Sequence, residues 1–286
     1  MYNAAITKNI LKGCASIIFA GALFSCGNSD KDAAQSLYAQ AEYLYNNKQY
    51  NNSITLLDSL KNNYKGDIEL LKKGLHLRTL NQEGLILAEI EQADSLIAAL
   101  ETENNRLSGS FKYIKLPDMV EGYYIHKSIA GEIDKTDRTD IEPRIDEYDE
   151  FYIVSYLTGQ DIKHTGISLT ANAGSVKSAT VPHDGAQNYR FKSGGKSYES
   201  ITFKHDQCDT LGYFTTANDN AKIKATFHGK KNYSTQLSSK QIKAIAETYR
   251  YATCKTQGKA TIQKRLFLEQ KLDLARKQII QTKLEE

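Results

Sequence analysis

The sequence predicts an α+β fold in which helices at both ends flank an antiparallel β sandwich or barrel. Apolar residues at helical spacing dominate the early part of the chain and return near its end. Short alternating segments, separated by turn residues, fill the middle. We therefore expect a helical domain at 32–112, a β domain at 113–236 and C-terminal helices at 237–286 that pair back on the first domain.

The N-terminal segment has the features of a signal peptide. Lys8 and Lys12 supply positive charge before a mostly apolar run from Gly13 to Phe24. That run is shorter than the about 20 residues that a membrane-spanning helix needs. We therefore expect residues 1–25 to be removed and leave them out of the fold.

The end of the apolar run, Leu23-Phe24-Ser25-Cys26, resembles the lipobox of bacterial lipoproteins. In that family the cysteine thiol receives a diacylglycerol, the chain is cut before it, and the new amino group is acylated. The resemblance implies that acylated Cys26 binds the membrane, with Cys14 as the rival site. Phe24 departs from the pattern, because a small or hydroxyl residue usually stands there. An ordinary secretory signal with an incidental cysteine is the alternative.

A short polar tether, residues 26–31, follows the cysteine. At about 3.6 Å per extended residue, it keeps the folded body within roughly 25 Å of the lipid. Asp30 in the tether and Asp32 just after it resemble the surface-export signals of some outer-membrane lipoproteins. The expected location is therefore the cell envelope, at the outer membrane.

The first helices have small and large packing residues at spacings that resemble one tetratricopeptide-like hairpin over residues 33–66. Asn46-Asn47 supplies the turn, and small Ser53 stands where two helices would approach closely. Stacked repeats need about three units for stability, so a generic helical hairpin fits equally well. The matching residues are Ala41, Leu44, Tyr50, Ser53, Leu57 and Leu60.

Two apolar seams with alternating spacings of four and three lie on either side of the β region. We expect the two helices to pair antiparallel within the chain, with Asn104 fixing the register. Self-association through intermolecular coiled coils is the alternative. The first seam comprises Ile86, Ile90, Ala93, Ile97, Leu100, Asn104 and Leu107, and the second Leu268, Leu272, Ala275 and Ile279.

The middle region alternates strand-like segments with turns. Gly194-Gly195 indicates a two-residue hairpin, because such turns need positive φ angles. Residues 132–150 contain nine acidic and three basic residues and are predicted to form a solvated acidic loop. The predicted strands are 151–157, 166–171, 175–181, 188–192, 197–203, 211–216 and 221–227.

Composition limits the partners of the chain. Its net charge of +3 and expected export argue against nucleic acid. The absence of Trp lowers the case for glycan binding, although 18 Tyr offer contact faces. Cys208 and Cys254 remain after the signal and anchor cysteines, so one disulfide is expected in an oxidising envelope, with two free buried thiols as the alternative.

No short catalytic motif is present, and we predict no catalytic residue, metal ligand or cofactor. His205 and Cys208 are three residues apart but would point to opposite faces of a strand. His126, His164, His183 and His228 are interpreted as surface or hairpin residues. The leading hypothesis is a non-catalytic lipid-anchored scaffold with an envelope protein partner. The alternatives are a ligand- or glycan-binding surface protein and a hydrolase with a dispersed active site.

Overall fold

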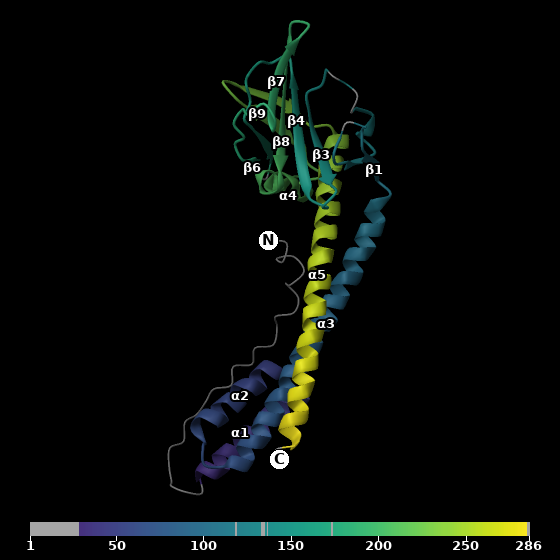
Figure 1. Ribbon diagram of the computed structural model, residues 1–286. Helices are drawn as coiled ribbons and strands as arrows, with labels where there is room; N and C mark the ends of the chain where they lie inside the picture. The colour runs from purple at the N-terminus through teal and green to yellow at the C-terminus, as the bar shows by residue number, and fades with distance from the viewer. Residues whose placement is uncertain (1–28, 118, 133–134, 136, 173, 285–286) are drawn as a thin grey trace. The chain divides into compact units, whose positions relative to one another are not determined.

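The computed structural model describes residues 29–117, 119–132, 135, 137–172 and 174–284 (Figure 1). The lipobox and Cys26 lie outside the described residues. The described residues divide into two compact units, one made of those up to Leu87 together with those from Lys271 onward, and the other of those within Ala88–Gln270. The predicted α+β class is confirmed in its coarse form, since helices precede and follow two antiparallel sheets.

In the first unit, α1 (Ser29–Asn46) and α2 (Tyr50–Asn63) form a hairpin beside the first turns of α3 (Ile68–Ser108) (Figure 1). Ser53 is fully buried and donates a hydrogen bond to the Ala41 carbonyl at 2.7 Å, which lets the two helices approach closely. Asn81 of α3 donates to the same hydroxyl at 2.9 Å. These polar contacts fix the hairpin against α3.

The end of α5 (Ser239–Leu284) completes this unit. Arg276 Nε lies 2.9 Å from Glu83 Oε1, and the His76 Nδ1 and Thr282 Oγ1 atoms are 3.0 Å apart. Residue numbers rise along α3 as they fall along α5, so the two helices run antiparallel. Leu272 and Ala275 of the second seam are buried.

The same two helices also meet within the second unit. Arg265 of α5 forms an ion pair with Asp94 of α3, and the seam residues Ala93 and Leu268 are buried. Asn104 Oδ1 is buried there and has no hydrogen-bond partner among the described residues. Ser238 caps α5, because its hydroxyl accepts the Gln241 N–H at 3.3 Å. Within the described ranges, no helix has both the length and the apolar character needed to cross a membrane.

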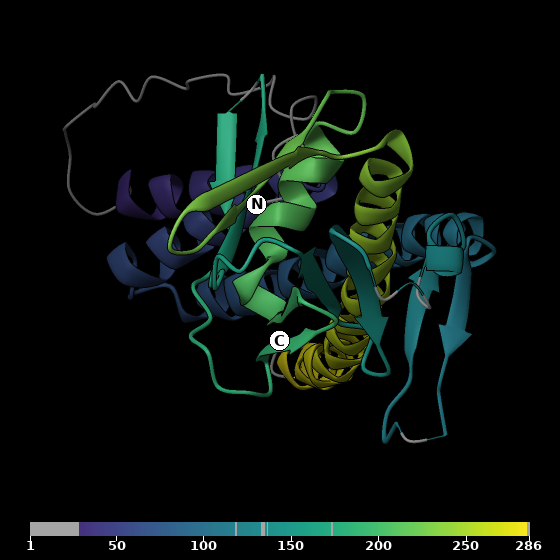
Figure 2. The same ribbon diagram turned by 90° about the horizontal axis from the view of Figure 1, so that it is seen from above.

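The second unit contains two antiparallel sheets (Figure 2). They share a core with α4 (Asp209–Ala217) and α5, including the fully buried side chains of Ile153, Phe203 and Phe227. The six-stranded sheet has the order β1 (Phe111–Ile114), β2 (Tyr123–His126), β3 (Asp140–Asp146), β4 (Phe151–Thr158), β8 (Lys196–Lys204) and β7 (Asn188–Ser193). The four-stranded sheet has the order β10 (Asn232–Gln236), β9 (Lys224–His228), β5 (Gly166–Ala171) and β6 (Gly174–Lys177).

The β7–β8 hairpin agrees with the prediction from Gly194-Gly195, whose φ angles are +56° and +79°. Two other predictions are wrong. The segment 211–216 is part of α4, where Leu211, Phe214 and Thr215 recur at helical spacing and are buried. The acidic stretch 132–150 is not all a solvated loop, since it contains β3 in the middle of the larger sheet.

Candidate functional site

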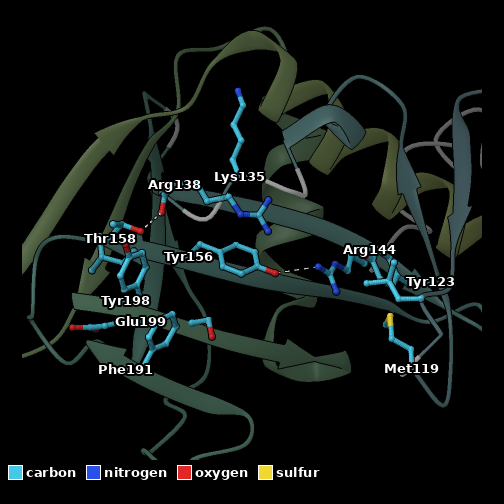
Figure 3. A pocket seen from close by; sticks show the side chains of 13 residues that line it. Met119, Tyr123, Lys135, Arg138, Arg144, Tyr156, Thr158, Phe191, Tyr198 and Glu199 are labelled. Carbon is cyan, nitrogen blue, oxygen red and sulfur yellow. Dashed lines mark hydrogen bonds between the residues drawn. The ribbon is translucent and has the colours of Figure 1, made fainter. Parts of the chain in front are cut away.

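A pocket of about 430 Å³ opens on one face of the six-stranded sheet (Figure 3). Its walls combine arginine and aromatic side chains from β2, β3, β4, β7 and β8 with residues of the loops before β2 and β3. The lining residues are Leu116, Met119, Tyr123, Lys135, Arg138, Arg144, Tyr156, Leu157, Thr158, Phe191, Tyr198, Glu199 and Ser200.

Strand alternation explains why polar residues gather on this face. Successive side chains of a strand point to opposite faces. In β3, Ile141 and Ile145 enter the shared core, so Glu142 and Arg144 take the opposite face. Tyr156 on β4 shares that face because it lies between the core residues Ser155 and Leu157.

Two arginines form the floor of the pocket, and a buried glutamate that does not line it holds both. Arg138 Nη1 donates to Glu142 Oε2 at 2.6 Å, and Arg144 Nε donates to Glu142 Oε1 at 2.5 Å. The side chain of Glu142 is 1% exposed, and those of Arg138 and Arg144 are 10% and 13% exposed. Arg144 also donates to the Tyr156 hydroxyl at 3.0 Å (Figure 3). Both oxygens of one buried carboxylate therefore hold both guanidinium groups.

Each guanidinium group lies over the face of a tyrosine ring. Arg138 Cζ lies 3.7 Å from the centre of the Tyr156 ring, and Arg144 Cζ lies 3.8 Å from that of Tyr123. Burial raises the pKa of both tyrosines, so the rings stay neutral at physiological pH. A neutral ring face attracts a cation through its quadrupole.

The outer wall is aromatic. Phe191 and Tyr198, paired across β7 and β8, stack with ring centres 4.7 Å apart and an angle of 7° between the planes. The Tyr198 hydroxyl donates to Asp137 at 2.7 Å, which orients its ring. Opposite these rings stand the arginines of the floor (Figure 3). The pocket can therefore hold an anionic group on its floor and a flat apolar group against its wall.

A second polar cluster lies in the core beneath the sheet. The Ser155 hydroxyl is 2.9 Å from His164 Nε2, and His164 Nδ1 is 2.7 Å from Glu199 Oε2. This order of groups is that of a Ser–His–acid triad. Ser155 and His164 are 0% exposed, however, so no substrate can reach the hydroxyl. We interpret the cluster as structural.

The surface assignment of two histidines is wrong. His164 is fully buried in this cluster, and His126 is 4% exposed, with its Nε2 atom 2.8 Å from Glu247 Oε2. Each has found a carboxylate partner from a distant part of the sequence. A histidine that looks isolated in sequence can therefore belong to a buried network.

The residues singled out around Cys208 do not come together. Cys208 is buried and its thiol donates to the Phe203 carbonyl at 3.1 Å, whereas His205 is exposed. His205 instead meets Asp146 and Glu150, and one potential ligand atom from each lies within 4.8 Å of the others. Cys208 and Cys254 are both free thiols in the structure.

Sequence patterns do not reveal the arginine floor, because Arg138 and Arg144 lie in the stretch 132–150, whose many acidic residues predict a solvated loop. A signal for it exists in the sequence Ile141-Glu142-Pro143-Arg144-Ile145, where charged and apolar residues alternate as in a strand with one buried face. The partners on the other strands carry no comparable signal.

No protein-family model matches the chain, and no curated protein or solved structure matches it.

Proposed function

We propose that this is a non-catalytic envelope lipoprotein, anchored through acylated Cys26, whose larger sheet binds a small anionic ligand in the pocket. The ligand carries an acid group, which the two arginines bind, and a flat apolar part, which rests against Phe191 and Tyr198. The lipobox-like segment Leu23–Cys26 supports the anchor.

One observation carries the ligand-binding part of the proposal. Arg138 and Arg144 lie largely buried on the floor of a concave pocket, already held by Glu142 and by two tyrosine rings. Each guanidinium has five N–H donors, and the bonds to Glu142 use only part of them. Charged groups fixed in this way in a hollow are typical of binding sites.

This pocket favours ligand binding over a scaffold function. A scaffold needs an exposed contact surface, whereas the arginines here are gathered inside a hollow. We further propose that the two sheets face one another as a sandwich. The support is the shared core, in which Ile153 and Phe203 of one sheet and Ile167 and Phe227 of the other are buried in one cluster.

Benzoate, a flat ring with one carboxylate, is a suitable probe for this proposal. We expect saturation-transfer NMR at low salt to detect its binding to the purified protein. The variant Phe191→Ala removes one stacked ring from the wall and should weaken binding about fivefold, which corresponds to about 1 kcal/mol for an aromatic contact.

Tyr43→Ala is the control, because Tyr43 is an exposed aromatic residue on α1, in the other unit, and does not line the pocket. This variant should bind benzoate like the wild type. Equal losses in the two variants, or no binding to the wild type, would contradict the proposal.

A further inference from the structure

The charge of the pocket suggests which anions it accepts, an inference that rests on the function proposed above. We infer that Glu142 restricts the pocket to singly charged acids, so that it binds carboxylates and rejects phosphate monoesters. Glu142 thereby acts as a specificity-determining residue, although it does not line the pocket.

The floor carries two positive charges, and the buried Glu142 bonded to both arginines carries one negative charge. Arg138 and Arg144 stay charged at any physiological pH. Glu142 is 1% exposed and accepts a hydrogen bond from each of them, through a different oxygen. Its negative charge is therefore fixed between the two cations, and a single positive charge remains for a ligand.

The rest of the lining adds no further net positive charge. Glu199 is among the lining residues, but its carboxylate points into the core beneath the sheet, where it is bound to the backbone N–H groups of Lys163 and His164 and to the His164 ring. Lys135, near the rim, pairs with Glu132 at 2.5 Å. A ligand thus meets one surplus positive charge beside the fixed negative charge of Glu142.

A carboxylate satisfies this arrangement, because its one charge is neutralised and its two oxygens match the forked donors of a guanidinium. A phosphate monoester carries close to two negative charges above its second pKa of about 6. Its second charge would lie near Glu142 without a cation to balance it. Like charges brought together in a poorly solvated site repel strongly.

Benzoate and phenyl phosphate test the inference, because they share the ring and differ in the acid group. Their dissociation constants are measured by NMR titration of the full-length protein at pH 8. We expect the wild type to bind benzoate at least about tenfold more tightly. In Glu142→Gln, which removes the negative charge at nearly constant shape, the preference should fall or reverse in favour of phenyl phosphate.

Glu142→Asp keeps the charge and should keep the preference for benzoate. Tighter or equal binding of phenyl phosphate by the wild type overturns the inference but leaves the proposed function standing. Failure of both probes to bind overturns the proposed function itself. If Glu142→Gln does not fold, as circular dichroism would reveal, the wild type and Glu142→Asp still decide the result.

Discussion

The buried carboxylate of Glu199 should contribute strongly to the stability of the second unit. It accepts hydrogen bonds from the Lys163 N–H at 2.7 Å, the His164 N–H at 2.6 Å and the His164 ring at 2.7 Å. Glu199 is 4% exposed, so water cannot replace these bonds. The carboxylate therefore fixes the loop between β4 and β5 to β8.

The variant Glu199→Gln replaces one acceptor oxygen with an amide that donates. The His164 ring can adapt by exchanging its tautomer, but one backbone N–H is left facing another donor. Losing a bond to a charged group costs about 1.5–3 kcal/mol, and leaving a buried N–H without an acceptor costs about 1–3 kcal/mol. We expect unfolding to become easier by about 3–5 kcal/mol.

Urea unfolding followed by near-ultraviolet circular dichroism of the tyrosines measures this loss. Asp161→Asn is the control, because Asp161 is an exposed acid that pairs with Lys192. Its unfolding midpoint should not change. If Glu199→Gln unfolds at the same urea concentration as the control, the carboxylate does not hold the loop and the reasoning is wrong.

The contribution of the Glu199 carboxylate to stability should depend on pH. Burial alone raises the pKa of Glu199, but hydrogen bonds from the His164 ring and the two backbone N–H groups outweigh it and hold the pKa below its ordinary value of 4.5. A group with a lowered pKa stabilises the folded state above its unfolded pKa. The difference between wild type and Glu199→Gln should therefore be full at neutral pH and shrink as the pH falls through the lowered pKa.

Three further predictions concern the anchor, the helices and the thiols. Metabolic labelling with a fatty-acid probe should be lost in Cys26→Ser and kept in Cys14→Ser, and the reverse pattern would place the lipid on Cys14. Truncation after Gln270 removes Leu272, whose burial contributes about 1.5–3 kcal/mol to stability. Amide hydrogen exchange in α1 and α2 should therefore become faster. Unchanged exchange would show that the end of α5 does not stabilise these helices. Burial raises the pKa of both Cys208 and Cys254, so the half-buried Cys254 should be alkylated slowly and the buried Cys208 only after unfolding. If neither cysteine is alkylated in the unfolded, non-reduced protein, the two form a disulfide.

The local features of the fold could be predicted from the sequence. Helical spacing indicated the helices that became α1, α2 and α3, because each apolar stripe arises from nearby residues. Gly194-Gly195 marked a hairpin, because positive φ angles favour glycine at those positions. Such local patterns can be recognised without knowing which distant residues pack against them.

The pocket could not be predicted in the same way. Arg144, Tyr156 and Tyr198 come from three strands, and only the register between strands brings them to one face. The strand β3 is hard to predict because it contains Glu142 and Arg144, and charged residues usually indicate exposed segments. Here they are buried because they form ion pairs with one another and with Arg138. The burial of His164 is not predictable from nearby residues either, because its carboxylate partner Glu199 is 35 residues away.

The two arginines of the pocket are stacked on tyrosine rings and bonded to the same glutamate, and this has a thermodynamic consequence. A free arginine side chain gives up about 2 kcal/mol of conformational entropy when it is fixed. Here Tyr123, Tyr156 and Glu142 have already immobilised both side chains, so that cost falls on folding and not on ligand association. If the proposed ligand binds, the floor of the pocket should therefore keep the same side-chain conformations with and without it.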